Sequence, residues 1–288
     1  MKKDLGTICA TLKSWSEKKV WLKILSILLV GETVAFNACT KSKVEEPIVP
    51  KENTVTDICG RTYPVVKIGE QYWMAENLAC IEYDTQSEPY NAGLRKLSTS
   101  EDETIEPYYT NGMDQSKWKD PEYAINLTDK QIQKLGFLYN WAAAMGYKSA
   151  REAQSQTENH IGTRQGICPN GWHLPNMEEW NLLIKAISKK YDSGSIDNAG
   201  THMKTTSYWF DGFPEYEAGD NVSGFSALPA GDSVGKLVYA IGTDAFFWSS
   251  DADGSDKACN RYLSCDGSGL FSYNFEKSYA MSVRCVRN

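Results

Sequence analysis

The stretch C168-P-N-G-W-H-L-P-N-M-E-E-W180 decides how this chain folds, because it contains the start of its clearest helix. Asn176 is a favoured N-cap residue, and Glu179 stands three residues later at the capping-box position. The apolar residues that follow are Trp180, Leu183, Ile184, Ile187 and Tyr191. Their spacing of three and four residues places them on one helix face. The sequence therefore predicts a helix that starts after Asn176 and ends before Gly194.

The same stretch also places His173, one of only three histidines, close to Glu178 and Glu179. A metal or catalytic cluster is one interpretation of this group. His173 precedes the helix, however, Glu179 is better used at the cap, and the spacing is not H-E-x-x-H. His160 and His202 lie in polar regions and complete no recognisable triad. We therefore interpret the stretch as scaffolding.

Upstream, the runs T62-Y-P-V-V-K-I68 and Q71-Y-W-M-A-E-N77 flank the dipeptide G69-E70. A glycine in first place suits a two-residue type II′ hairpin turn. Facing residue numbers then sum to 139, as those of Cys59 and Cys80 do, and the two cysteines face each other at a non-hydrogen-bonded position. We expect a cross-strand disulfide between them. The alternative is that both are reduced and unrelated.

Downstream of residue 200 the sequence consists of short runs broken by Gly, Ser and Asp, such as A245-F-F-W-S-S250 and L270-F-S-Y-N-F275. This pattern is typical of a loop-rich β region, and its position after a helical region predicts an α+β layout. The polar stretches 84–127 and 148–166 are predicted to be largely loop. With 41% hydrophobic residues and a net charge of −7, the chain is globular and presents no basic face for nucleic acid.

Residues 1–38 are interpreted as an export signal. A basic run ending in K18-K-V-W-L-K23 precedes the apolar I24-L-S-I-L-L-V30, which is well short of the roughly 20 residues of a membrane span. F36-N-A-C-T40 resembles a bacterial lipobox, which implies that Cys39 is lipidated at the outer membrane or cell surface. The alternative is a cleaved, soluble secreted protein. Residues 39–56 are then a polar tether to a domain at 57–288.

Six blocks of sequence, in order, resemble one known family. They are V66-K-I-G-E-Q-Y-W-M-A-E-N-L78, G136-F-L-Y-N-W141, C168-P-N-G-W-H-L-P-N-M-E-E-W180, S223-G-F-S-A-L-P-A-G231, F247-W-S-S250 and S282-V-R-C-V-R287. Together they are similar to the Fibrobacter succinogenes major paralogous domain. That resemblance, from about residue 57 to the C-terminus, implies an exported, often lipid-anchored protein whose biochemical role is largely undefined.

The block H173-L-P-N-M-E-E-W180 also resembles the formylglycine-generating-enzyme fold, which is a C-type-lectin-like variant. This likeness implies a twisted antiparallel sheet, two flanking helices and long loops on one side. In such folds a disulfide commonly ties a helix region to the last strand. By resemblance, Cys168 and Cys285 fit that role.

Two groups of residues are candidate ligand contacts. The loop D251-A-D-G-S-D256 follows Trp248 and offers calcium the carboxylates of Asp251, Asp253 and Asp256, although its glycine is not at the EF-hand position. A solvated acidic loop is the competing interpretation. The second group comprises aromatic residues expected in exposed loops: Tyr108, Tyr109, Trp118, Trp209 and Phe210. They would stack on sugar rings or dock a protein, or they would pin their loops to the core.

The sequence thus predicts a surface-tethered, non-enzymatic module that binds a glycan or a protein, with calcium as the one candidate cofactor. An enzyme of the formylglycine-generating type is an alternative, and it would need Cys259 and Cys265 as a reactive pair. Nothing near them suggests activation by a base. A structural envelope lipoprotein that binds no small ligand is a further alternative.

Overall fold

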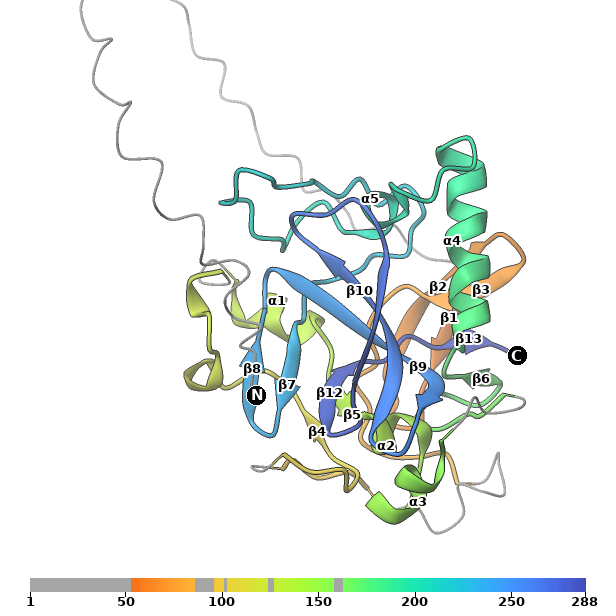
Figure 1. The fold of residues 1–288 in the computed structure, drawn as a ribbon, viewed down its shortest axis with the longest axis vertical. Coiled ribbons are helices and arrows are strands. Elements are labelled where there is room, and N and C mark those ends of the chain that lie inside the picture. The colour runs from red at the N-terminus through yellow and green to blue at the C-terminus, as the bar shows by residue number, and fades with distance from the viewer. Residues whose placement is uncertain (1–52, 86–95, 101–102, 124–126, 158–162) are drawn as a thin grey trace, which may run out of the picture. The chain divides into compact units, whose positions relative to one another are not determined.

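The computed structural model describes residues 53–85, 96–100, 103–123, 127–157 and 163–288 (Figure 1). The predicted export signal, Cys39 and most of the tether lie outside the described residues. The end of the predicted tether forms a strand instead, β1 (Thr54–Thr56), which pairs with the next strand. The folded domain therefore begins a few residues before the predicted boundary at residue 57. No helix in the described part of the chain is long and apolar enough to cross a membrane.

The first sheet is built on the predicted hairpin of β2 (Thr62–Ile68) and β3 (Gln71–Met74). Ile68 pairs with Gln71 and Val66 with Trp73, as the sum of 139 predicts. The strand order is β1-β2-β3-β13-β6, where β13 is Val286–Arg287 and β6 is Trp172–His173. Gly69 has a φ of +59°, and a Cβ there would lie 2.7 Å from the Cβ of Ala186. The turn therefore needs glycine both for its backbone and for its close contact with a helix.

Both expected disulfides are present. Cys59 and Cys80 are joined with their Cα atoms 5.6 Å apart. However, the paired strands stop at Thr62 and Met74, so the bridge lies beyond the ladder rather than at a position within it. The second bridge joins Cys168 to Cys285 across 5.9 Å and connects the segment before β6 to the residue before β13.

The second sheet has eight strands. Its main order is β11 (Phe271–Glu276), β10 (Lys257–Ser264), β9 (Asp244–Asp253), β12 (Tyr279–Ser282), β5 (Leu138–Asn140) and β4 (Tyr109–Thr110). The hairpin of β7 (Asp232–Val234) and β8 (Leu237–Tyr239) pairs with β12. The sheet is antiparallel except where β12 runs parallel to β9. This arrangement confirms the α+β class.

Five α-helices accompany the sheets in the described residues, where the resemblance implied two. They are α1 (Asp129–Lys134), α2 (Trp141–Met145), α3 (Ala150–Ser155), α4 (Met177–Tyr191) and α5 (Ala199–Met203). Short 3₁₀ turns occupy Gln115–Lys117 and Pro121–Tyr123. Most of these helices are a single turn or little more, and only α4 is long enough to cover a sheet.

Helix α4 confirms the prediction from the opening stretch. Asn176 accepts from the backbone N–H of Glu179, and the Glu179 side chain accepts from the backbone N–H of Asn176. The predicted apolar face is buried except for Tyr191, which is half-buried. Trp180 contacts Trp73 of the first sheet and Phe247 of the second, at ring-centroid distances of 4.8 and 5.8 Å. One helix face therefore joins the two sheets.

Candidate functional site

The candidate site begins at β11, an edge strand whose sequence F271-S-Y-N-F275 alternates aromatic and polar residues. Alternation places Phe271, Tyr273 and Phe275 on one face of the strand. The side chains of Phe271 and Tyr273 are 43% and 54% exposed. They are the only exposed large apolar side chains on the strands that the structure describes, which distinguishes β11 from the others.

Neighbouring strands extend these rings into a continuous surface. Tyr262 on β10 lies 5.3 Å from Phe271 and 5.6 Å from Phe246 on β9, measured between ring centroids. Phe275 lies 5.6 Å from Phe246, 5.2 Å from Tyr273 and 5.2 Å from Tyr279 on β12. These six residues are called the aromatic face: Phe246, Tyr262, Phe271, Tyr273, Phe275 and Tyr279.

Strand alternation explains why these rings lie on the side of the sheet away from α4. Phe247 and Arg261, next to Phe246 and Tyr262 in sequence, point to the other side of the sheet. There Phe247 contacts Trp180, and Arg261 donates a hydrogen bond to the side chain of Asn181, both on α4. The helix therefore covers one side of β9 and β10, and the aromatic face occupies the opposite side.

Acidic groups border the aromatic face. Burial, followed by the charge of Asp244, raises the pKa of Asp232 to about 7. Burial raises the pKa of Asp244 to about 6, although hydrogen bonds from Thr243 and Ser264 oppose the shift. The two carboxyl residues are neighbours, since Gly231 N–H donates to the backbone oxygen of Asp244. Both side chains are therefore partly protonated near neutral pH.

The same field acts on the tyrosines of the aromatic face. Burial and then Asp232 and Glu276 raise the pKa of Tyr279 to about 12. Burial and then Asp244 and Asp266 raise the pKa of Tyr262. Every charged group that shifts these two phenols is acidic, so the surroundings of the face are electronegative.

Comparison with known protein families identifies the family of this chain. A profile of the Fibrobacter succinogenes major domain matches residues 66–287. The chain belongs to this family. No curated protein and no solved structure matches it. All six residues of the aromatic face lie within the matched range of this major domain, whereas β1 and Cys59 precede it.

The predicted calcium loop of the major domain holds its carboxylates apart. Asp251 accepts from the backbone N–H of Met177, and Asp253 accepts from the side chain of Asn274. Within the described ranges, the only three candidate metal-ligand atoms that converge belong to Asp57, Cys59 and Cys80, whose cysteines form a disulfide. Asp251, Asp253 and Asp256 thus do not converge on one point.

The positive charge beside the predicted calcium loop is the ammonium group of Lys277. Lys277 Nζ donates to the carbonyl oxygens of Gly254 and Ser255 at the tip of the hairpin, both at 3.0 Å. Trp248, predicted to contact ligand beside the same loop, is fully buried and donates from Nε1 to the backbone of Tyr139. It is a core residue, because it packs in the buried cluster that includes Tyr139 and Trp141.

The loop aromatics predicted as exposed are mostly buried, which corrects that expectation. Tyr108, Trp118 and Trp209 are buried, while Tyr109 and Phe210 are half-buried. Tyr108 donates to Ser278 O, Trp118 to Gly112 O and Trp209 to Thr205 Oγ1. These rings pin their loops to the core. The exposed rings lie on β11 instead, where the F-x-Y-x-F alternation was the available signal.

The remaining candidates are the histidine cluster of the opening stretch and the two cysteines outside the disulfides. Buried His173 lies between Glu179 Oε1 at 2.8 Å and Asn288 Oδ1 at 2.7 Å, which supports its interpretation as scaffolding. Glu178 is exposed, and His160 lies outside the described residues. Cys259 and Cys265 form no disulfide. Burial, followed by the charges of Asp251 and Asp253, raises the pKa of Cys259 to about 11, which disfavours the thiolate that a catalytic role would need.

Proposed function

We propose that this major domain is a non-enzymatic binding or adhesion module and that the aromatic face contacts a glycan ligand. The observation that supports this most strongly is the unbroken chain of ring contacts from β11 to β12, with two rings about half exposed. Exposed apolar patches on soluble domains mark binding surfaces. Tyrosine combines an apolar ring with a hydroxyl, which suits the alternating C–H and O–H groups of a sugar.

The electronegative border narrows the ligand class. A polyanionic glycan would be repelled by the carboxylates of Glu276 and Asp266, which act on the tyrosines of this face. A neutral glycan meets no such penalty, and its hydroxyl groups donate to carboxylates. The preferred ligand is therefore a neutral polysaccharide. Whether binding needs calcium is tested in the assay below.

A binding assay on immobilised glycans tests this proposal. Neutral glucans and mannans are compared with polygalacturonate, with and without calcium, using the wild type, Tyr273→Ala and Ile196→Ala. Ile196 is a matched control because it is 58% exposed but lies in the loop after α4. Loss of one stacked ring is worth about 1 kcal/mol, so Tyr273→Ala should weaken binding to a neutral glycan several-fold while Ile196→Ala leaves it unchanged.

Two outcomes would contradict the proposal. The first is the absence of any glycan signal above background in both calcium conditions. The second is a glycan signal that Tyr273→Ala leaves intact, because the ligand would then bind elsewhere. Binding to immobilised proteins alone would replace glycan by protein as the ligand class.

We further propose that the domain is exported and held by a lipid on Cys39 at the outer membrane or cell surface. The two disulfides support export to an oxidising compartment. The lectin-like variant of the α+β fold is likewise proposed from motif resemblance. Metabolic labelling with a fatty-acid probe should mark the wild type and not Cys39→Ala, and protease treatment of intact cells should degrade a surface-exposed domain. Label on the Cys39→Ala variant would refute attachment at that residue.

A further inference from the structure

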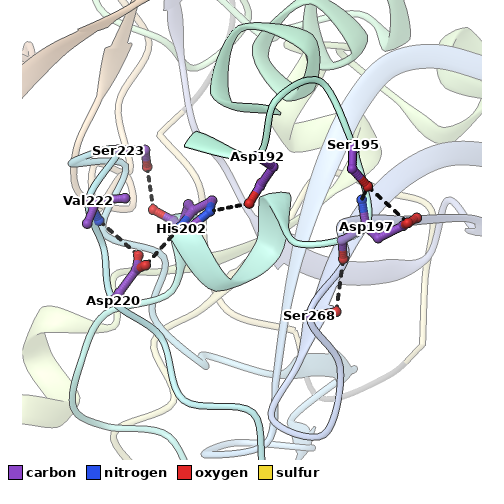
Figure 2. A network of polar contacts seen from close by, with 8 residues as sticks. All are labelled: Asp192, Ser195, Asp197, His202, Asp220, Val222, Ser223 and Ser268. Atoms are coloured by element: carbon purple, nitrogen blue, oxygen red, sulfur yellow. Dashed lines mark hydrogen bonds and ion pairs between the residues drawn. The ribbon is translucent and has the colours of Figure 1, made fainter. Parts of the chain in front are cut away.

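A histidine outside the aromatic face is clamped between two carboxylates (Figure 2). His202 on α5 places Nε2 2.9 Å from Asp192 Oδ1 and Nδ1 2.8 Å from Asp220 Oδ2. Asp192 is the C-cap residue of α4, and Asp220 belongs to the long connection between α5 and β7. The ring therefore joins three segments of the chain.

Geometry determines the protonation state of this ring. A carboxylate can only accept hydrogen bonds, and a neutral imidazole carries a single N–H. Both contacts are therefore satisfied only when the ring is a doubly protonated imidazolium. Loss of its proton would leave one nitrogen lone pair facing a carboxylate oxygen at less than 3 Å, which is repulsive.

The surroundings reinforce this dependence. The side chains of His202 and Asp192 are only 13% and 11% exposed, whereas that of Asp220 is 41% exposed. The second oxygen of Asp192 is buried without a hydrogen-bond partner, so the charge of Asp192 depends on His202 for compensation. From α4, the Tyr191 ring packs 5.3 Å from the imidazole, with Lys190 Nζ 4.9 Å above that ring.

The charges around His202 also favour the protonated ring that the geometry requires. Burial alone would lower the pKa of His202, but the hydrogen bonds and charges of Asp192 and Asp220 outweigh it, and the pKa is raised. Asp192 and Asp220 are the charged groups responsible, one on α4 and one on the connection. Helix α5 itself carries no other charged residue.

We propose that Asp192, His202 and Asp220 form a pH-sensitive latch that holds residues 220–223 of the connection 205–226 most tightly against α4 and α5 while the ring is protonated. Other bonds converge on the same point. Asp220 N–H donates to Thr201 O, and Ser223 Oγ donates to His202 O. Tyr191 OH donates to Val222 O. Residues 220–223 are thus the place where the connection is held, and the charged bond is the one that pH can remove.

The direction of the switch follows from linkage. The pKa of His202 is higher in the folded protein than in the unfolded chain. The stabilisation that the protonated ring gives to the closed latch is therefore fully present below the unfolded pKa of about 6.5, and it disappears as pH rises through the folded pKa. Each unit by which the pKa is raised corresponds to about tenfold in the opening equilibrium of the connection. The latch is therefore closed in acid and released as pH rises through the raised pKa of His202.

Two variants test whether the contact of His202 with Asp220 is a pH-sensitive latch or only a structural contact that does not respond to pH. In Asp220→Asn the amide can donate to a neutral ring or accept from a charged one, so closure no longer requires the proton. Asp211→Asn removes an exposed carboxylate of the same connection that has no bond to His202. The readouts are the pKa of His202 by NMR and hydrogen exchange of residues 205–226 between pH 6 and 9, corrected for intrinsic exchange rates.

In the wild type and Asp211→Asn, the pKa of His202 should exceed 6.5, and protection of 205–226 should fall at least several-fold across that pKa. In Asp220→Asn the pKa should drop and protection should become nearly independent of pH. A wild-type pKa at or below 6.5 would overturn the proposal. So would protection that stays constant while His202 titrates, or an Asp220→Asn profile identical to that of the wild type.

Discussion

At the scale of single residues, three fully buried cations hold loops of this domain, and none of them forms an ion pair with a carboxylate of the described residues. Lys204, Lys277 and Arg284 are each 0% exposed. Lys204 Nζ donates to three backbone carbonyls and Lys277 Nζ to four. Arg284 donates to three backbone carbonyls and to Asn77. Carbonyl dipoles replace water around each charge, and the loops that supply them are thereby fixed in place.

Lys277 offers a direct test of this mechanism. Burial lowers its pKa to about 8, so the carbonyls and the Trp141 ring only partly replace lost hydration. Substitution should nevertheless destabilise the fold, because Lys277→Met removes the ammonium donor from four carbonyl oxygens. We expect a loss of about 3 kcal/mol in the free energy of unfolding by urea denaturation. Lys257 is an exposed lysine on the β9–β10 hairpin, whose tip Lys277 binds. Lys257→Met should change the free energy of unfolding by less than about 0.5 kcal/mol. Equal effects would refute the role of the carbonyl cage.

At the scale of elements, the features that residue spacing predicted correctly were local. The cap at Asn176 and the register of β2 with β3 depend on residues close together in the chain. The aromatic face could not be derived in this way. Its rings come from β9, β10, β11 and β12, and only the pairing of Tyr262 with both Phe246 and Phe271 brings them together. The rings of β11 were not among the predicted ligand contacts, and its F-x-Y-x-F alternation would have indicated only one strip of this surface.

Errors at this scale share one physical cause. Trp118 and Trp209 were expected to be exposed because polar residues surround them in the sequence, yet both rings are buried. A long loop in a domain with short helices must be anchored, and a tryptophan supplies large apolar area with one N–H to satisfy. The carboxylates of Asp251 and Asp253 were likewise close in sequence, but backbone and side-chain donors from Met177 and Asn274 draw them to different partners.

At the scale of the whole molecule, the two disulfides close loops of very different size. The Cys59–Cys80 bridge spans 21 residues, and the Cys168–Cys285 bridge spans 117. The larger loop contains α4, β7, β8, β9, β10, β11 and β12. Closing a longer loop removes more conformational entropy from the unfolded chain. The Cys168–Cys285 bridge should therefore contribute more to the free energy of unfolding than the Cys59–Cys80 bridge.

The difference is measurable. With loop closure scaling as 1.5RT ln n, the Cys168→Ala/Cys285→Ala variant should lose about 1.5 kcal/mol more free energy of unfolding than Cys59→Ala/Cys80→Ala. The Cys168–Cys285 pair is buried at both ends and the Cys59–Cys80 pair only at Cys80, so each variant also loses some packing. Urea denaturation of the two variants and the wild type at one pH supplies the comparison, with Cys259→Ala as a control that removes a thiol but no bridge. A larger loss in the Cys59–Cys80 variant would mean that native contacts at the hairpin, rather than unfolded-chain entropy, dominate the contribution of the bridges.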